Sequence, residues 1–456
     1  MPRSALERSS ASSPLEAWRA TEHLPYTCVS DPRTVALFLT LFSIALCYFS
    51  PEAVVPFLAP YHIQQFLLGG AVVISLVTFN INRGGLRSTQ TILMGAFWFA
   101  IVISVLTRGW LRDSLTAFLQ FGLVVGVFLL VVINAYSVRR ISLFCRVISL
   151  CALVMALEAI VARYTGIQAD KLVWSRIVDG ELVQRVNGYG ILNDANDFAQ
   201  FLLIGLAFLG VSWRKGDPIR NFILVLLPGS ILIYTIYLTG SRGAIFGLAA
   251  IAFVVISRRM SMVQSAVLAG LVVVTLVLGK FGRGADISLH ESSAAGRVMA
   301  WGSGISQLRS DPLFGVGFGQ FIEYSDMTAH NSFVLCFAET GFFGYFFWLA
   351  LLVTSALGLE GLNKLPVNTP EDADFARCVT AVRAALYTFL ATAWFLSRTY
   401  HETLYIILAL ATVLICLRRE EFPATDLPLV RWAPLTFVVQ VASVLAIYAI
   451  IRLRAF

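Results

Sequence analysis

The sequence predicts an all-α polytopic membrane protein, and three observations support this fold class. Of the 456 residues, 58% are hydrophobic and only 13% are charged, whereas about a quarter of the residues in soluble domains are charged. The hydrophobic residues gather in blocks of roughly 16 to 25, the length of helix that crosses a bilayer. These blocks are apolar on every face, unlike barrel strands, which alternate apolar and polar positions.

Thirteen apolar blocks follow one another along the chain, and we expect about 12 or 13 membrane-spanning helices. A polar tail, residues 1–33, precedes them and lacks the apolar core of a signal peptide. The N-terminal region, 34–163, holds blocks near 34–49, 65–81, 90–107, 114–135 and 141–163. The central region, 164–358, holds blocks near 195–213, 220–239, 243–258, 262–279 and 331–357. The C-terminal region, 359–456, holds blocks near 376–397, 403–418 and 435–452, and whether the last one spans is left open.

The basic residues predict the orientation of the chain, because Lys and Arg are enriched in short cytoplasmic loops. One alternating set of loops is basic and is expected in the cytoplasm with the tail; it includes Arg139 and Arg140, Arg258 and Arg259, and Arg418 and Arg419. The opposite set should face outward and includes two long loops, 164–194 and 280–330, the second of them before the tenth helix. This dispersal of basic residues argues against nucleic acid as the partner that the net charge of +7 suggests.

Sequence motifs exclude several other kinds of site. The seven cysteines lie mostly inside apolar blocks without Cys-x-x-Cys spacing, so neither a disulfide framework nor a metal site is predicted. The chain has no P-loop and no His-Glu-x-x-His motif, which removes the best evidence for a nucleotide-driven pump or a zincin protease. The glycines between Gly315 and Gly319 do not follow a strand as in a dinucleotide site, and we expect them to form tight turns.

Four arginines fall on outward loops, and they are the candidate anion-binding residues: Arg185, Arg242, Arg297 and Arg398. Arg242 lies in so short a turn that it must sit at the hydrocarbon boundary. A guanidinium held there presents a rigid donor fork that suits phosphate oxygens. The alternative for each arginine is ordinary anchoring, in which the side chain reaches a lipid headgroup.

The candidate general base is His330, which directly precedes a predicted helix start. The partial positive charge at a helix N-terminus disfavours the imidazolium, so the ring should stay neutral, as a base requires. His401, on another outward turn, is the rival base. Asp194 and Asp197 are expected to cap the following helix, with binding of acceptor hydroxyls as the alternative. Asp326 lies in the same loop as His330 and could orient it.

Taken in order, the outward motifs resemble the O-antigen ligase and polymerase family of bacterial membrane glycosyltransferases. The matching pieces are Asn193–Ala199, Ser241–Gly243, Gly296-Arg297 with Trp301, Pro312–Phe321, Ala329–Ser332 and Glu339–Gly341. Two features depart from the family pattern. Asp194 stands where the family often has proline, and a thirteenth apolar block exceeds the usual twelve spans.

The resemblance implies a GT-C-like fold in the bacterial inner membrane, with the active site facing the periplasm. Members transfer a glycan from undecaprenyl pyrophosphate to an acceptor hydroxyl, with inversion and without a nucleotide, metal or other cofactor. The acceptor is the lipid A core in ligases and another repeat unit in polymerases. Carried onto this chain, the family roles assign the pyrophosphate to Arg242 and Arg297, with Arg185 as a further candidate, and the acceptor hydroxyl to His330. The supporting candidates are Asp194, Asp197, Asp326, Arg398 and His401.

Two other classes of function stay open at this point. A flippase for the same lipid-linked sugars would also be built from many apolar helices, but it predicts ionisable residues near the bilayer midplane. A scaffold for polysaccharide assembly would not require converging arginines and a histidine. The expected partners are the undecaprenyl-pyrophosphate-linked glycan, an acceptor glycan or lipid A core, and membrane lipids. No feature of the sequence separates ligase from polymerase.

Overall fold

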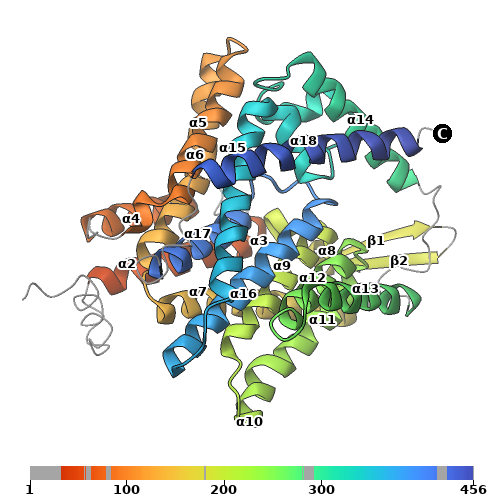
Figure 1. The fold of residues 1–456 in the computed structure, drawn as a ribbon. Helices are drawn as coiled ribbons and strands as arrows, with labels where there is room; N and C mark the ends of the chain where they lie inside the picture. Colours follow the sequence, from red (N-terminus) through yellow and green to blue (C-terminus); the bar gives the residue numbers. More distant parts are fainter. Residues whose placement is uncertain are drawn as a thin grey trace, which may run out of the picture.

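The structure is a computed structural model that describes residues 32–55, 57, 63–78, 84–178, 181–279, 281, 292–418 and 429–454. Helices dominate these residues (Figure 1), and the strands within them form one two-stranded hairpin. The architecture of the described residues is therefore all-α, as the apolar blocks predict. Residues 1–31 of the predicted tail and residues 282–291 of the second long loop lie outside the described residues.

Each of the thirteen apolar blocks coincides with a helix or a run of helices. The N-terminal region forms α2 (Pro32–Phe49), α4 (Ile63–Val77), α5 (Thr89–Leu106), α6 (Leu111–Asn134) and α7 (Val138–Thr165). The central region forms α9 (Ala195–Leu209), α10 (Pro218–Asn221) continued by η5 (Phe222–Leu226) and α11 (Leu227–Thr239), then α12 (Gly243–Ile256), α13 (Met262–Leu278) and α15 (Ser332–Asn363). The C-terminal region forms α16 (Pro370–Ala393), α17 (Glu402–Leu417) and α18 (Leu429–Arg454).

Length and composition divide these helices into groups. Among the described residues, seven helices are long and apolar enough to cross a membrane, and five more are apolar but have only 10 to 17 residues. The remaining helix, α16, has 24 residues and begins with the charged run Glu371, Asp372 and Asp374. The multi-pass membrane fold is thus confirmed, and the predicted 12 or 13 spans include the shorter helices as well as α16.

Burial shows which helices form the centre of the bundle. The apolar window that contains α9 is 83% buried, whereas that of α18 is 17% buried. The helix α9 packs against α7, α11, α12 and α16, and α15 packs against α5, α14, α16 and α18. Figure 1 shows α15 running through the middle of the molecule. The helices α9 and α15 therefore belong to the best-packed part of the fold. This packing can hold the side chains at their N-terminal ends rigidly.

The last helix, α18, lies across α15 and not along it (Figure 1). The Trp432 ring packs 6.4 Å from the Phe346 ring, and Gln440 Nε2 donates to the Phe342 carbonyl at 2.7 Å. The two contacts are eight residues apart on α18, about 12 Å along its axis, but only four residues apart on α15, about 6 Å along its axis. Two parallel or antiparallel helices would show equal spacings, so the two axes cross. The apolar block at 435–452 is thus a helix on the outside of the bundle that crosses its neighbour.

The two long loops between apolar blocks, 164–194 and 280–330, contain regular structure that was not predicted from the sequence. In 164–194, β1 (Val173–Val178) pairs antiparallel with β2 (Glu181–Val186), and η3 (Gly190–Leu192) leads into α9. In 280–330, α14 (Ser292–Ser310) packs against α15 and α18, and η7 (Phe321–Tyr324) follows it. The segment before the tenth apolar block therefore contains a docked helix of 19 residues, which fixes the position of the residues that follow.

The helix α15 is broken at Gly341, which has φ 61° and ψ −168°. We call residues 311–319 the glycine turn; it fills the break and bonds the backbone groups that the break releases. The four hydrogen bonds are Val316 N to Ala338 O at 2.9 Å, Gly317 N to Glu339 O at 3.0 Å, Phe342 N to Pro312 O at 2.8 Å and Phe343 N to Leu313 O at 3.0 Å. The break therefore leaves none of these buried backbone groups unpaired.

Glycine is required on both sides of this contact. A Cβ on Gly315, which has φ +73°, would lie closer than 3.0 Å to the Glu339 backbone. A Cβ on Gly341 would lie closer than 3.0 Å to the Leu313 backbone. The expected role of the glycines as turn formers holds, and the turn packs against a helix backbone.

Candidate active site

The first part of the site is the N-terminus of α9. Asp194 is the N-cap, and its carboxylate accepts from the backbone N–H of Asn196 at 2.8 Å and of Asp197 at 3.4 Å. Asp194 thus has the capping role expected from its residue type, while Asp197 points away to another element. The cap fixes the Asp194 carboxylate at the N-terminus of α9, where it faces the loop that carries His330.

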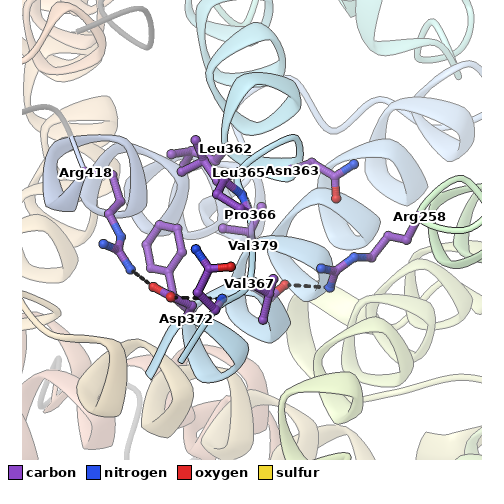
Figure 2. Close-up of a pocket in the computed structure, with 12 residues that line it drawn as sticks. Arg258, Leu362, Asn363, Leu365, Pro366, Val367, Asp372, Val379 and Arg418 are labelled. Carbon is purple, nitrogen blue, oxygen red and sulfur yellow. Dashed lines mark hydrogen bonds and ion pairs between the residues drawn. The ribbon is translucent and has the colours of Figure 1, made fainter. Parts of the chain in front are cut away.

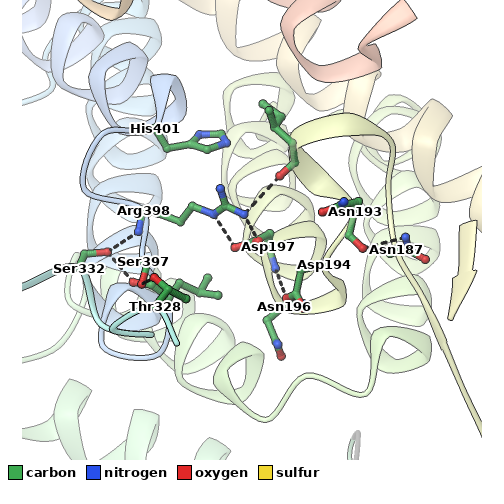
Figure 3. A network of polar contacts seen from close by, with 12 residues as sticks. Asn187, Asn193, Asp194, Asn196, Asp197, Thr328, Ser332, Ser397, Arg398 and His401 are labelled. Atoms are coloured by element: carbon green, nitrogen blue, oxygen red, sulfur yellow. Dashed lines mark hydrogen bonds and ion pairs between the residues drawn. The ribbon is translucent and has the colours of Figure 1, made fainter. Parts of the chain in front are cut away.

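Asp197 forms an ion pair with Arg398, on the turn between α16 and α17 (Figure 3). Arg398 Nε donates to Asp197 Oδ1 at 2.6 Å, Nη2 donates to the second carboxylate oxygen, and Nη2 also reaches the Ile191 carbonyl at 3.3 Å. The Asp197 side chain is 9% exposed and that of Arg398 24%, and burial lowers the pKa of Arg398. This two-pronged pair joins α9 to the α16–α17 turn and occupies much of the Arg398 donor fork.

Hydrogen bonds fix the start of α15 against the same turn. The Ser332 hydroxyl donates to the Leu396 carbonyl at 2.6 Å and accepts from the Arg398 backbone N–H at 2.9 Å. The Thr399 hydroxyl donates to the Ser332 carbonyl at 2.7 Å. Because Ser332 is fully buried, these bonds hold the residues just before α15 close to the Asp197–Arg398 pair.

His330 lies between α14 and α15, in a left-handed backbone conformation with φ 46°. Asn331 caps α15 by accepting from Phe333 N at 2.9 Å and Val334 N at 3.1 Å. The Trp301 indole of α14 donates to the Ala329 carbonyl at 3.0 Å. The residues on both sides of His330 are therefore held by side-chain bonds, and a conformation that is uncommon outside glycine is imposed on the histidine.

The surroundings of His330 favour the neutral imidazole. Burial, followed by the nearby Arg297 cation, lowers the pKa of His330, and the Asp194 carboxylate acts in the opposite direction. Arg297 precedes Trp301 by four residues, so both lie on the face of α14 that meets the His330 loop. Burial and Arg297 thus both favour the expected neutral ring. The structure brings His330, Arg297 and Asp194 together from three separate elements.

Arg185 links β2 to two other elements of the site. Its Nε donates to the Thr239 carbonyl at 2.7 Å, and its Nη2 donates to Asn196 Oδ1 at 3.1 Å. Thr239 ends α11 and is followed by the short turn to Arg242, the residue that precedes α12. Arg185 therefore lies beside the Arg242 turn and beside the capped end of α9, and it bonds to both.

Arg242 is half-buried at the position just before α12. A Cβ on the next residue, Gly243, would lie 3.5 Å from the Phe395 side chain. The Arg242 turn is thus packed against the turn that carries Arg398. All four candidate arginines are on elements that meet around the N-termini of α9, α12, α15 and α17.

His401 and Asp326 do not have the surroundings of a base and its partner. His401 caps α17, and its Nδ1 accepts from the Thr403 N–H at 3.3 Å. Burial, followed by the Arg398 cation, lowers the pKa of His401 to about 3. A neutral ring whose Nδ1 accepts carries its proton on Nε2, so neither nitrogen is free to take another. Among the described residues, no hydrogen bond or ion pair joins Asp326 to His330.

One arginine near this region was not among the candidates. Arg108, in the turn between α5 and α6, donates through Nη2 to the Gly315 carbonyl at 2.5 Å and pairs with Asp311 Oδ2 at 2.5 Å. Arg108 therefore binds the glycine turn through both a backbone carbonyl and a carboxylate. The available signal was its position, because the turn between the third and fourth apolar blocks alternates to the same side as the other site loops.

The site so defined combines cationic side chains with one neutral imidazole. Arginine side chains can bind an anionic group, and a neutral imidazole can accept a proton from a hydroxyl. Within the described ranges, no three or more His, Cys, Asp and Glu side chains are grouped so that they could hold a metal ion. The fold is that of a multi-pass helical membrane protein, and the candidate site at one end of its helices combines arginines with a histidine.

Comparison with known families identifies the chain more closely. Residues 227–349 match a family model described as O-antigen ligase, which supports the resemblance to the O-antigen ligase and polymerase family. The matched segment contains Arg242, Arg297 and His330, whereas Arg185 and the Asp197–Arg398 pair lie outside it. Comparison with curated proteins found no match. The family indicates a membrane enzyme of the glycosyltransferase type.

Proposed function

We propose that the protein transfers a glycan from undecaprenyl pyrophosphate to an acceptor hydroxyl at the periplasmic face of the bacterial inner membrane. The acceptor is the lipid A core or, in the alternative, a growing polysaccharide. The observation that carries the proposal is the placement of His330 beside Arg297, within the family segment and at the meeting point of α9, α14 and α15. A base and a cation are the two groups that such a transfer requires.

In the proposed reaction, His330 accepts the proton of the acceptor hydroxyl as its oxygen attacks the anomeric carbon of the donor glycan. The new bond from carbon to the acceptor oxygen forms while the bond from carbon to the pyrophosphate oxygen breaks. Undecaprenyl pyrophosphate leaves with the bonding electron pair, and the anomeric centre is inverted. Because the leaving group gains negative charge, fixed guanidinium groups stabilise the transition state more than the ground state.

The arginines have different parts in this work. Arg297 and Arg242 are assigned to the pyrophosphate, and Arg185 supports them from a position where two nitrogens are bonded to protein. Asp194 opposes the effect of Arg297 on His330. It therefore offsets part of the loss of proton affinity that the cation causes on the imidazole. The Asp197–Arg398 pair positions the start of α9 and α15.

The proposal is tested with purified protein in proteoliposomes that contain the lipid-linked glycan donor and an acceptor glycan. Arg297→Gln and Arg242→Gln should each lower the transfer rate about a hundredfold, the usual loss for one group that stabilises developing negative charge. The matched control is Arg309→Gln on the same helix as Arg297, because Arg309 lies over the Tyr448 ring at 5.4 Å. Wild-type transfer by both test variants, at normal expression, would refute the proposed roles.

Deletion of the gene separates the two acceptors. If surface polymer is made but is missing from the lipid A core, the protein is a ligase. If the core carries single repeats only, the protein is a polymerase. Unchanged surface glycans of both kinds would contradict a transferase role in either pathway.

A further inference from the structure

A second polar site lies at the opposite end of the bundle from His330. It is a cavity of about 190 Å³ between the C-terminal ends of α12, α15 and α17 and the N-terminal end of α16 (Figure 2). The helix α16 starts at this cavity and ends beside the Arg398 turn, and its 24 residues extend about 36 Å. The cavity is therefore on the side that the loop charges assign to the cytoplasm.

About half of the cavity wall is apolar, and this part includes Leu362, Leu365, Val367 and Phe375. Polar groups are placed at its two sides. On one side, Arg418 Nη2 donates to Asp372 Oδ1 at 2.6 Å, so this cation is matched by a carboxylate.

Arg258 lies on the other side of the cavity, and its partners are neutral. Its Nη1 donates to the Thr380 hydroxyl at 2.7 Å and to the Ala376 carbonyl at 3.2 Å. No carboxylate of the described residues forms an ion pair with it. Burial and the nearby Arg383 and Arg259 lower the pKa of Arg258, so further positive charge surrounds this side of the cavity.

The charges of the lining residues do not cancel. Arg258 and Arg418 contribute two positive charges and Asp372 one negative charge, which leaves one positive charge in the cavity. Arg383 does not supply the missing carboxylate, because it is itself paired with Glu360 at 2.6 Å. A site with one unmatched guanidinium and apolar walls is suited to a singly charged anion that has an apolar part.

We propose that this cavity binds the phosphate of an anionic phospholipid headgroup, with the glycerol and the first methylenes against its apolar walls. The site lies at helix ends, where headgroups of the adjoining leaflet are at hand. Basic pockets between transmembrane helices on the cytoplasmic side bind anionic headgroups in this way. The Arg258 fork supplies the contact to the phosphate, and Val367 and Phe375 supply part of the apolar wall.

The test measures lipid retention by the purified full chain with native mass spectrometry, during titration with phosphatidylglycerol or phosphatidylcholine of the same acyl chains. Phosphatidylglycerol should be retained more tightly, and Arg258→Gln should weaken it about tenfold, as loss of one charge-assisted contact predicts. The control Arg259→Gln should bind as wild type, because Arg259 is adjacent and exposed but does not line the cavity.

A second variant covers the case in which Arg258→Gln disturbs the contact between α12 and α16. Val367→Trp fills the cavity from an exposed loop position and leaves the Arg258 bonds in place. It should also lose the preference for phosphatidylglycerol. Equal retention of both lipids by the wild type, or full preference in both variants, would overturn the proposal. Binding of inorganic phosphate that phosphatidylglycerol does not displace would overturn the lipid as its source.

Discussion

Replacing Gly341 with alanine should destabilise the protein by about 3–5 kcal/mol. The backbone of Gly341 lies in a region reserved almost entirely for glycine, with φ 61° and ψ −168°, and imposing it on another residue costs about 1–3 kcal/mol. The new Cβ would also lie closer than 3.0 Å to the Leu313 backbone. The glycine turn must then move away from α15. Loss of two of the four backbone bonds that join them adds about 2 kcal/mol.

A matched control separates the two contributions. Gly319 belongs to the same turn and has φ +77°, but a Cβ there would meet nothing within 4 Å. Gly319→Ala should therefore cost only the backbone strain, about 1–2 kcal/mol. Both variants are compared with the wild type by thermal unfolding of the purified protein in detergent. Equal falls in Tm would show that the turn does not pack into the helix break as described.

The remaining predictions concern the polar residues of the site. Arg297→Gln should raise the pKa of His330, because the nearby cation lowers it; transfer requires the neutral ring, so the acidic limb of the pH–rate profile should move to higher pH. An acidic limb at the wild-type pH would contradict the effect of Arg297 on the pKa of His330. Asp197→Asn should destabilise the protein by about 3 kcal/mol, since it leaves Arg398 half-buried without its carboxylate; an unchanged Tm would argue against the tie between α9 and the α16–α17 turn. His401→Asn should keep transfer within a fewfold of wild type, because asparagine also caps helices; a large loss would restore His401 as a candidate base.

The apolar blocks and the caps could be predicted because they depend on neighbouring residues. The apolar blocks located the thirteen helices with ends that differ by up to six residues. The residue type of Asp194 indicated its cap. The order of the outward motifs indicated that Arg297 and His330 belong to one site. The orientation of the helices in the membrane and the roles of these residues stay predictions.

The hairpin and α14 were missed for different reasons. The hairpin had a local signal in Asp179-Gly180, since an Asp-Gly pair between apolar runs is typical of a tight hairpin turn. The helix α14 had little local sequence signal, because its segment Ser292–Ser310 contains three glycines. Each glycine disfavours a helix by about 1 kcal/mol relative to alanine. Its support is tertiary: a Cβ on Gly304 would lie closer than 3.0 Å to Val334 of α15.

The contacts across the site could not be predicted from the sequence. Asp197 and Arg398 are 201 residues apart, and Arg108 reaches the glycine turn 207 residues away. No local pattern specifies such pairs. The break in α15 could not be predicted either, because in the sequence Gly341 is a single glycine within an apolar helix. The break depends on the glycine turn, which packs against Gly341 from another part of the chain.

The transfer rate of the His330→Asn variant tests the proposed mechanism most directly. Asparagine tolerates the left-handed backbone that His330 adopts at φ 46°, so the loop should keep its shape while the base is lost. With purified protein in proteoliposomes and saturating lipid-linked donor, the rate should fall at least about a hundredfold. The KM for the donor should hold, because the arginines are unchanged. Transfer at the wild-type rate by a folded His330→Asn protein would contradict the assignment of His330 as the base.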